Sequence, residues 1–342
     1  MNTTRYRLFT GLLVLAILVG MTAPAPALQP DGPAAESQPS AESQPDVDGS
    51  EAAEVPEKEP PEDALTAEDI LSSARIVAHG MGAIGQVTTP LNCLEGFLAQ
   101  YWAGVRVFEA DLRLTRDGQV VLRHDWWNAD WQEGISWVAI PTREKFRSEP
   151  ILGKYTPLSF QDLLLLMEQY PDICVITDSK FTDSDVFTIQ FDAMLADARE
   201  LGLTYLFDRI VVQIYNSNMF HALDKLYPFP HYIYTLYNEG FGRTEEDFRE
   251  KADFCRRQGI KGLTMPEGWW DPAYAAIARE YGVRVYVHTV NNLDDAKRFL
   301  SSGVDGVYTD YLTPADLAKK SRSPSLGKAA GSGAEIPVEF FS

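Results

Sequence analysis

Two acidic side chains interrupt a stretch that otherwise has the pattern of a β-strand. Residues 105–112 read VRVFEADL, a run of β-branched and aromatic residues in which Glu109 and Asp111 stand two positions apart. Side chains along a strand alternate between its two faces, so both carboxylates point the same way. Burying such charges without a partner is unfavourable by roughly several kcal/mol or shifts their pKa values. We therefore expect a cationic group to accompany them.

A second pair with the same spacing follows later in the chain. Asp178 and Lys180 come at the end of the strand-like run ICVITDSK, residues 173–180. Three carboxylates against one lysine leave an excess of negative charge, which a divalent cation would neutralise. Ligation by oxygen atoms alone favours Mg²⁺ or Ca²⁺ over Zn²⁺. The residues thus predict a site for one divalent cation, Mg²⁺ or Ca²⁺, beside these carboxylates.

Two histidines add groups that exchange protons near neutral pH. His79 ends the strand-like run RIVAHG, and His124 follows TRDGQVV, in which the Asp-Gly pair predicts a tight hairpin turn. Such a hairpin would return His124 to the vicinity of the first carboxylate pair. A cation that polarises an anionic substrate, with one imidazole as base and the other as acid, is sufficient to cleave a phosphodiester.

These residues collect at the ends of strands in an alternating pattern of strands and helices. The chain has 342 residues, of which 45% are hydrophobic. Eight strand-like runs alternate with helical patterns over about 250 residues, which predicts a TIM (β/α)8 barrel with an insertion after strand 2. The runs cover residues 75–80, 105–112, 173–180, 209–215, 231–237, 262–268, 283–290 and 304–310. Active sites of such barrels lie at the C-terminal ends of the strands, where Gln213, His288 and Asp310 also occur.

The N-terminus has the order of an export signal. Two arginines precede the apolar run GLLVLAILVG, and small residues follow at alternate positions from Ala23 to Ala27. We predict a signal peptide over residues 1–28 and an exported protein, secreted or at the cell surface. The apolar run is short for a membrane span, which favours cleavage over a permanent anchor.

Composition divides the rest of the chain. Residues 29–69 hold 13 acidic residues against Lys58 alone, a net charge of −12 out of −19 for the whole chain. We predict a disordered acidic linker over residues 29–68, the barrel over 69–320 and a flexible tail over 321–342. The chain lacks clustered basic residues, which argues against nucleic acid as a partner. Its three widely spaced cysteines predict buried thiols and no disulfide scaffold.

The motifs resemble those of the glycerophosphodiester phosphodiesterase family, whose barrels are related to those of phosphatidylinositol-specific phospholipase C and sphingomyelinase D. The family has a first histidine, a Pro-Glu-Asn-Thr segment, E-x-D followed by T-x-D-G, and H-D. In their places stand AHG, PLNCLEGF, FEADLRLTRDG and RHD, from residue 78 to residue 125. ITDSK, VHTVNN and GVDGVYTD continue the resemblance, which covers about residues 75–317.

The resemblance implies roles for individual residues. It implies His79 and His124 as the catalytic pair. It also implies that the metal ligands are Glu109, Asp111 and Asp178 and that Lys180 contacts the phosphate. We add Gln213 and His288 as substrate-binding residues. His288 stands at a tryptophan position of the family, where it either faces the phosphate or contacts other site residues without touching the substrate. Asp125 either orients the ring of His124 or caps the turn.

Three departures from the family pattern bear on the substrate. Gly80 and Met81 stand where an arginine usually follows the first histidine, and Leu91 replaces the glutamate of Pro-Glu-Asn-Thr. The third ligand is an aspartate in D-x-K, which is more similar to sphingomyelinase D. We expect cleavage of a glycerophosphodiester or a related phospholipid-derived diester. The alternatives are a cyclising lyase of the phospholipase C/D kind and a non-catalytic barrel that binds phospholipid or glycan.

Other polar and aromatic residues admit a structural interpretation. Asn92, at the start of a helical pattern, is either a site residue or the N-cap of that helix, and we expect the N-cap. The insertion contains a cluster of tryptophans: Trp126, Trp127, Trp131 and Trp137. These either pack the loop over the barrel or form an aromatic lid over a lipid or sugar tail. A phospholipid-derived substrate is also compatible with contact at a membrane surface.

Overall fold

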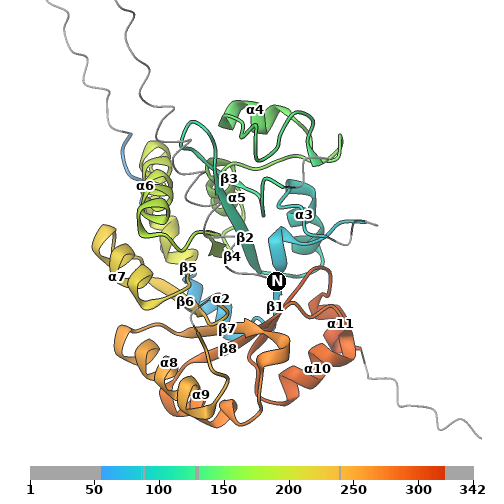
Figure 1. Ribbon diagram of the computed structural model, residues 1–342. Coiled ribbons are helices and arrows are strands. Elements are labelled where there is room, and N and C mark those ends of the chain that lie inside the picture. Colours follow the sequence, from blue (N-terminus) through green and yellow to red (C-terminus); the bar gives the residue numbers. More distant parts are fainter. Residues whose placement is uncertain (1–54, 86, 88, 128–130, 239, 320–342) are drawn as a thin grey trace, which may run out of the picture.

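The computed structural model describes residues 55–319 except 86, 88, 128–130 and 239, and they form a closed barrel of parallel strands (Figure 1). Each strand pairs in parallel with its neighbours, and β1 pairs with both β2 and β9, which closes the barrel. The strands are β1 (Ile76–Ala78), β2 (Val107–Leu114), β4 (Cys174–Asp178), β5 (Ile210–Ile214), β6 (His231–Thr235), β7 (Gly262–Pro266), β8 (Arg284–His288) and β9 (Gly306–Thr309). All eight predicted strands occur where the sequence places them, so the predicted TIM barrel is confirmed.

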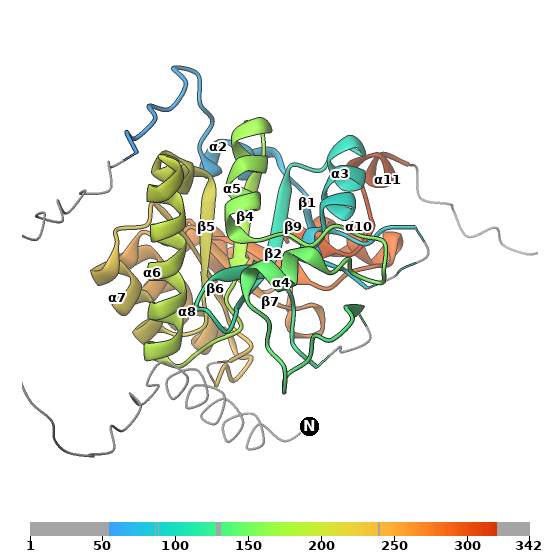
Figure 2. The ribbon, with the colours of Figure 1, turned by 90° about the horizontal axis from the view of Figure 1, so that it is seen from above.

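Helices surround the barrel (Figures 1 and 2). They are α3 (Leu94–Trp102), α4 (Arg143–Ser148), α5 (Phe160–Gln169), α6 (Ser184–Leu201), α7 (Ser217–Leu226), α8 (Glu245–Gln258), α9 (Tyr274–Tyr281), α10 (Leu293–Ser301) and α11 (Pro314–Ala318). Ser159 starts α5 with a capping box, and Gly259 ends α8 in the left-handed conformation with φ +74°. These local signals explain why helix ends were predictable. None of the described helices combines the length and apolar character that a membrane span requires.

A hairpin extends β2 beyond the barrel. β3 (Val120–Leu122) runs antiparallel to β2, with Leu112 opposite Leu122 and Leu114 opposite Val120. Gly118 adopts φ +72° in the turn, a conformation that favours glycine. The predicted hairpin is therefore present, and it brings the segment after β3 back along β2 to Asp111.

The N-terminal end of the barrel is closed by α2 (Ala67–Ser73). The predicted linker included the first two residues of this helix. Ala67 and Ile70 are buried against inward-facing residues of the strands, such as Val77. Residues 55–66 also contact the barrel, since the Lys58 N–H donates to the Gly202 carbonyl over 2.9 Å. The predicted linker over 29–68 is thus too long at its C-terminal end, because composition does not reveal such tertiary contacts.

Two further predictions concern the chain ends and the cysteines. The predicted signal peptide over residues 1–28 and the tail over 321–342 lie outside the described residues. The cysteines behave as predicted, because all three are buried free thiols: Cys93, Cys174 and Cys255.

Candidate active site

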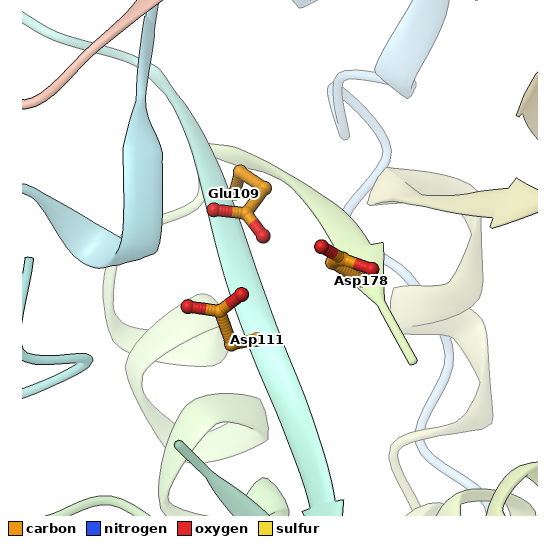
Figure 3. Close-up of side chains that lie close together, drawn as sticks. All are labelled: Glu109, Asp111 and Asp178. Atoms are coloured by element: carbon orange, nitrogen blue, oxygen red, sulfur yellow. The ribbon is translucent and has the colours of Figure 1, made fainter. Parts of the chain in front are cut away.

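Three carboxylates meet at the C-terminal end of neighbouring strands (Figure 3). Glu109 and Asp111 lie on β2, and Asp178 ends β4 directly opposite Asp111 in the sheet register. One oxygen of each carboxylate lies within 4.8 Å of the others. The three residues are buried, with exposed fractions of 2%, 1% and 6%. The strand register thus assembles the cluster that the spacing of the acids predicts.

Hydrogen bonds and an ammonium group neutralise only part of this charge. The Gly80 N–H donates to Glu109 Oε2 over 2.6 Å. Lys180 Nζ lies 2.5 Å from Asp111 Oδ1 and also pairs with Asp178 Oδ2. Glu109 Oε1 has no hydrogen-bond partner among the described residues. The cluster therefore has a buried carboxylate oxygen that still needs a cation or a proton.

The pKa values follow from this unequal distribution of partners. Burial raises the pKa of Glu109, and the neighbouring charge of Asp111 raises it further. Burial acts in the same direction on Asp111, but Lys180 and other cationic groups outweigh it and leave the pKa of Asp111 below its ordinary value. Burial opposes protonation of Lys180, yet the carboxylates, Asp111 first, raise its pKa above the ordinary value. Lys180 therefore stays charged, while Glu109 is the acid with the least compensation.

The donor set fits a hard divalent cation. Its ligand atoms are carboxylate oxygens, which Mg²⁺ and Ca²⁺ prefer. The oxygens lie within 4.8 Å of one another, and Glu109 Oε1 is buried with no hydrogen-bond partner in the part of the chain that the structure describes. An ion that contacts Glu109 together with Asp111 and Asp178 would remove this unfavourable state. The cluster can thus hold a divalent cation.

The first predicted histidine lies beside this cluster and is held by an aspartate. His79 directly follows β1, and its Nδ1 lies 2.8 Å from Asp310 Oδ1. Asn291 Nδ2 donates to the other oxygen of Asp310 over 2.6 Å. Burial disfavours the charged ring, but the bond to Asp310 and the charges of Glu109 and Asp111 raise the pKa of His79 to about 9. Asp310 is predicted at the end of the last strand with no assigned role, and the structure shows it bonded to His79.

The hairpin places the second histidine next to the same cluster. The Arg123 N–H donates to the Asp111 carbonyl over 2.8 Å, immediately before His124. His124 Nδ1 lies 2.8 Å from Asp125 Oδ2, and the Trp127 N–H donates to Asp125 Oδ1 over 2.7 Å. Asp125 thus both orients the ring and bonds the following turn, so the two predicted alternatives are both present. Each histidine has a carboxylate at Nδ1, which leaves Nε2 as the nitrogen that can exchange a proton.

Asn92 corrects one prediction. It is not the N-cap of α3, because Cys93 occupies that position and accepts from the Gly96 N–H. Asn92 is fully buried with φ +52°, and its Nδ2 donates to Asp111 Oδ2 over 2.7 Å. Its Oδ1 accepts from the Asp111 N–H over 3.0 Å. Asn92 therefore fixes a carboxylate 19 residues away, a contact that no local rule reveals.

The structure also explains why position 80 carries no side chain. Gly80 has φ +49°, and a Cβ there would lie 2.6 Å from Pro90 Cβ and 3.2 Å from Asn92 Nδ2. The space that an arginine would need is filled by these two residues.

The two predicted substrate-binding residues lie on the inner wall of the barrel. Gln213 follows the inward-facing Val211 by two positions on β5 and is 5% exposed. His288 ends β8, with its ring centroid 5.8 Å from that of Tyr237 and 6.0 Å from that of Tyr308. Burial lowers the pKa of His288 to about 3, so its ring is neutral. Both side chains face the interior, but no direct bond joins either to the carboxylates among the described residues.

The tryptophans of the insertion divide into two groups. Trp126 is buried against Phe146, and the Arg123 guanidinium lies over the rings of Trp126 and Trp131. The rings of Trp127 and Trp137 lie 5.2 Å apart and remain 53% and 43% exposed. Part of the cluster therefore packs the loop, and an aromatic pair stays at the surface, with Trp127 two residues after Asp125.

Comparisons with known proteins agree with this geometry. A sequence model of the glycerophosphoryl diester phosphodiesterase family matches residues 85–313. No curated protein matches the chain.

Solved structures show the same fold. The chain is 23% identical to a Silicibacter pomeroyi protein assigned as a glycerophosphoryl diester phosphodiesterase, with a TM-score of 0.60 and coverage of 73% of this chain and 95% of that one. It is 15% identical to an Oleispira antarctica phosphodiesterase in complex with the product sn-glycerol-3-phosphate, with a TM-score of 0.55 and coverage of 70% and 93%. A Parabacteroides distasonis glycerophosphoryl diester phosphodiesterase is 16% identical, with a TM-score of 0.54 and coverage of 75% and 91%.

Proposed function

The chain belongs to the glycerophosphoryl diester phosphodiesterase family and is a phosphoric diester hydrolase, and from this we propose that it hydrolyses a glycerophosphodiester, or a related diester derived from a phospholipid, with a divalent cation and two histidines. The observation that carries the proposal is the buried carboxylate cluster flanked by two histidines, each bonded to an aspartate at Nδ1. A small substrate of this kind agrees with the product bound to the Oleispira antarctica enzyme.

In this proposal Glu109, Asp111 and Asp178 are the ligands of one Mg²⁺ or Ca²⁺ ion. When bound, the cation would polarise a phosphoryl oxygen and neutralise part of the charge that develops on it. The buried oxygen of Glu109, to which no described residue donates, supports this assignment. Lys180, which lies against two of these ligands, is the proposed contact to the phosphate.

The two histidines are the proposed acid and base. One Nε2 removes a proton from the attacking water, and the other gives a proton to the leaving alkoxide. Asp310 and Asp125 hold the two rings through Nδ1, which keeps Nε2 of His79 and His124 available. Gln213 and His288 are the proposed contacts to the rest of the substrate, since both face the barrel interior.

The test is a substrate panel followed by phosphorus NMR. Glycerophosphocholine, glycerophosphoglycerol and lysophosphatidylcholine are incubated with purified protein in EDTA, Mg²⁺ or Ca²⁺. We expect turnover with metal only, and loss of at least about 100-fold in His79→Asn and His124→Asn. His221→Asn, at an exposed position on α7, is the matched control. Failure to cleave any diester with either metal would overturn the proposal.

The same spectra decide between hydrolysis and cyclisation. Attack by water gives a phosphomonoester, whereas attack by a hydroxyl of the substrate gives a cyclic phosphate with a distinct chemical shift. Membership in a family of hydrolases favours the first outcome and favours turnover over the non-catalytic barrel. A cyclic product would assign the chain to the lyase alternative.

We also propose that the protein is exported. We further propose that its exposed aromatic pair, Trp127 and Trp137, contacts the apolar part of a lipid-derived substrate at a membrane surface. Indole rings favour such interfaces, and Trp127 of this pair donates its backbone N–H to Asp125, the residue after His124. The double variant Trp127→Ser/Trp137→Ser should bind phosphatidylcholine vesicles less than wild type in a sedimentation assay. Trp102→Ser, a change at a 75% exposed tryptophan on α3, is the control. Equal binding by both variants would refute the membrane contact.

A further inference from the structure

Arg113 continues the inward face of β2 beyond the metal-site carboxylates. It follows Asp111 by two positions on the same strand, so its side chain leaves β2 on the same side as Glu109 and Asp111. Its guanidinium lies 5.3 Å from the ring centroid of Phe181, the residue after Lys180. The side chain therefore crosses from β2 toward the end of β4, where the carboxylates lie.

Only one nitrogen of this guanidinium is used within the described residues. Arg113 Nε donates to the His124 carbonyl over 2.9 Å, and no described residue forms an ion pair or another hydrogen bond with the side chain. Lys180 pairs with Asp111 and Asp178, and neither acid bonds to Arg113 among the described residues. The two Nη groups thus remain available beside a cluster of charges.

The electrostatic surroundings show that the guanidinium is close to the site. Burial lowers the pKa of Arg113, while the nearby charges of Asp111, Asp125 and Asp178 act in the opposite direction. An arginine remains cationic under any condition relevant to the enzyme. The side chain is also anchored at Nε and over the Phe181 ring, so little of its entropy remains to be lost when a ligand binds.

We propose that Arg113 is a second cationic contact for the substrate's phosphate, in addition to Lys180. This inference rests on the proposed phosphodiesterase function and deepens it. The planar guanidinium presents two parallel N–H donors, which match two oxygens of a phosphate, whereas the ammonium of Lys180 acts as a point charge. The side of β1 offers no such group, because Pro90 and Asn92 fill the space beside Gly80.

The experiment measures phosphate binding separately from turnover. Inorganic phosphate is titrated into Mg²⁺-loaded wild type, Arg113→Gln, Arg113→Lys and the control Arg116→Gln, whose exposed arginine lies in the hairpin turn. We expect Arg113→Gln to weaken phosphate binding roughly 10- to 100-fold, Arg113→Lys to weaken it less, and the control to match wild type. KM should rise by one common factor for glycerophosphocholine, glycerophosphoglycerol and glycerophosphoserine.

Three results would overturn the inference. Unchanged phosphate binding with a lower kcat would mean that Arg113 only holds the His124 carbonyl. A loss confined to glycerophosphoserine would mean that it binds a charged head group. If Arg113→Gln does not fold, as judged by its thermal transition, then unchanged phosphate binding in Arg113→Lys would refute the inference.

The proposed function fails in a different way. Wild type that binds phosphate through Arg113 but cleaves no diester would refute the phosphodiesterase proposal and leave this contact standing. If wild type cleaves diesters while both Arg113 variants bind phosphate normally, the phosphodiesterase proposal stands and the Arg113 contact is refuted.

Discussion

Asp310→Asn is the most informative single change, because the two hydrogen bonds of Asp310 use both of its carboxylate oxygens and the variant has only one oxygen. Asp310 accepts from Asn291 Nδ2 through one oxygen, and its other oxygen lies 2.8 Å from His79 Nδ1. An asparagine offers only one oxygen. The variant must therefore either lose the bond to Asn291 or force the proton of His79 from Nδ1 to Nε2. The second outcome places the proton on the wrong nitrogen of His79, and the first removes the bond that holds the acceptor of the ring in place.

The size of the effect follows from the pKa of His79. Its pKa in the fold is about 9, against an ordinary value of 6.5. At about 1.4 kcal/mol per unit, the protonated ring stabilises the metal-free fold by roughly 3 kcal/mol. The bond to Asp310 is one part of this, and a hydrogen bond to a charged group contributes about 1.5–3 kcal/mol. We expect Asp310→Asn to destabilise the fold by about 1–3 kcal/mol where His79 is protonated.

The sign of the pH dependence is fixed by the direction of the shift. A group whose pKa is raised in the fold contributes its full stability below its unfolded pKa, and that contribution is lost as the pH rises through the folded value. For His79 the contribution is full below about pH 6.5 and disappears above about pH 9. The difference between wild type and variant should thus be large at pH 6 and small at pH 10.

Urea unfolding in EDTA at pH 6 and pH 10 measures this difference without bound metal, and kcat with metal measures the catalytic effect. We expect kcat to fall by about 100-fold or more. Asp294→Asn, an exposed change in the first turn of α10, is the control. A variant with the kcat of wild type, or with the same loss of stability at both pH values, would show that Asp310 does not act through His79.

Three further predictions test the surroundings of the site. Asn92→Ala should lower the affinity for Mg²⁺ or Ca²⁺ by about 10- to 100-fold in calorimetry, because it leaves Asp111 without two bonds; equal affinity would refute this role. Gly80→Ala should lower the melting temperature more than Gly85→Ala, since both have positive φ but only the first Cβ meets another residue; equal losses would exclude the steric argument. Burial raises the pKa of Asp197 to about 6, so its stabilising contribution exists at low pH and is lost as pH rises through about 6. We compare the free energy of unfolding of Asp197→Asn with that of wild type in urea. The value for the variant minus the value for wild type should be about 1–3 kcal/mol higher at pH 8 than at pH 4, and a difference independent of pH would contradict this.

The predictable part of the site is the part that a strand or a turn encodes locally. The alternation of Glu109 and Asp111 places both carboxylates on one face of β2 whatever surrounds them. The Asp-Gly pair before β3 specifies a hairpin, and the hairpin length then returns His124 to the neighbourhood of Asp111. Asp178 could be placed with them because parallel strands of a barrel end at the same rim.

The parts that were missed depend on contacts between distant segments. Asn92 has the residue type of an N-cap and lies one residue before the N-cap of α3, yet its side-chain bonds go to Asp111. Residues 55–66 have the composition of a linker, but Lys58 meets Gly202 and Glu168 on the barrel. Composition and local propensity carry no information about such partners.

By itself, the sequence determined the eight strands, the hairpin and the set of acids and histidines, because periodicity and turn chemistry act over a few residues. Only the tertiary structure decided how these groups are paired. It joined His79 to Asp310 across 231 residues, left one oxygen of Glu109 without a hydrogen-bond partner among the described residues, and directed Arg113 across the end of β4. Pairing depends on how the barrel closes and on which donors are already used, and both are properties of the whole fold.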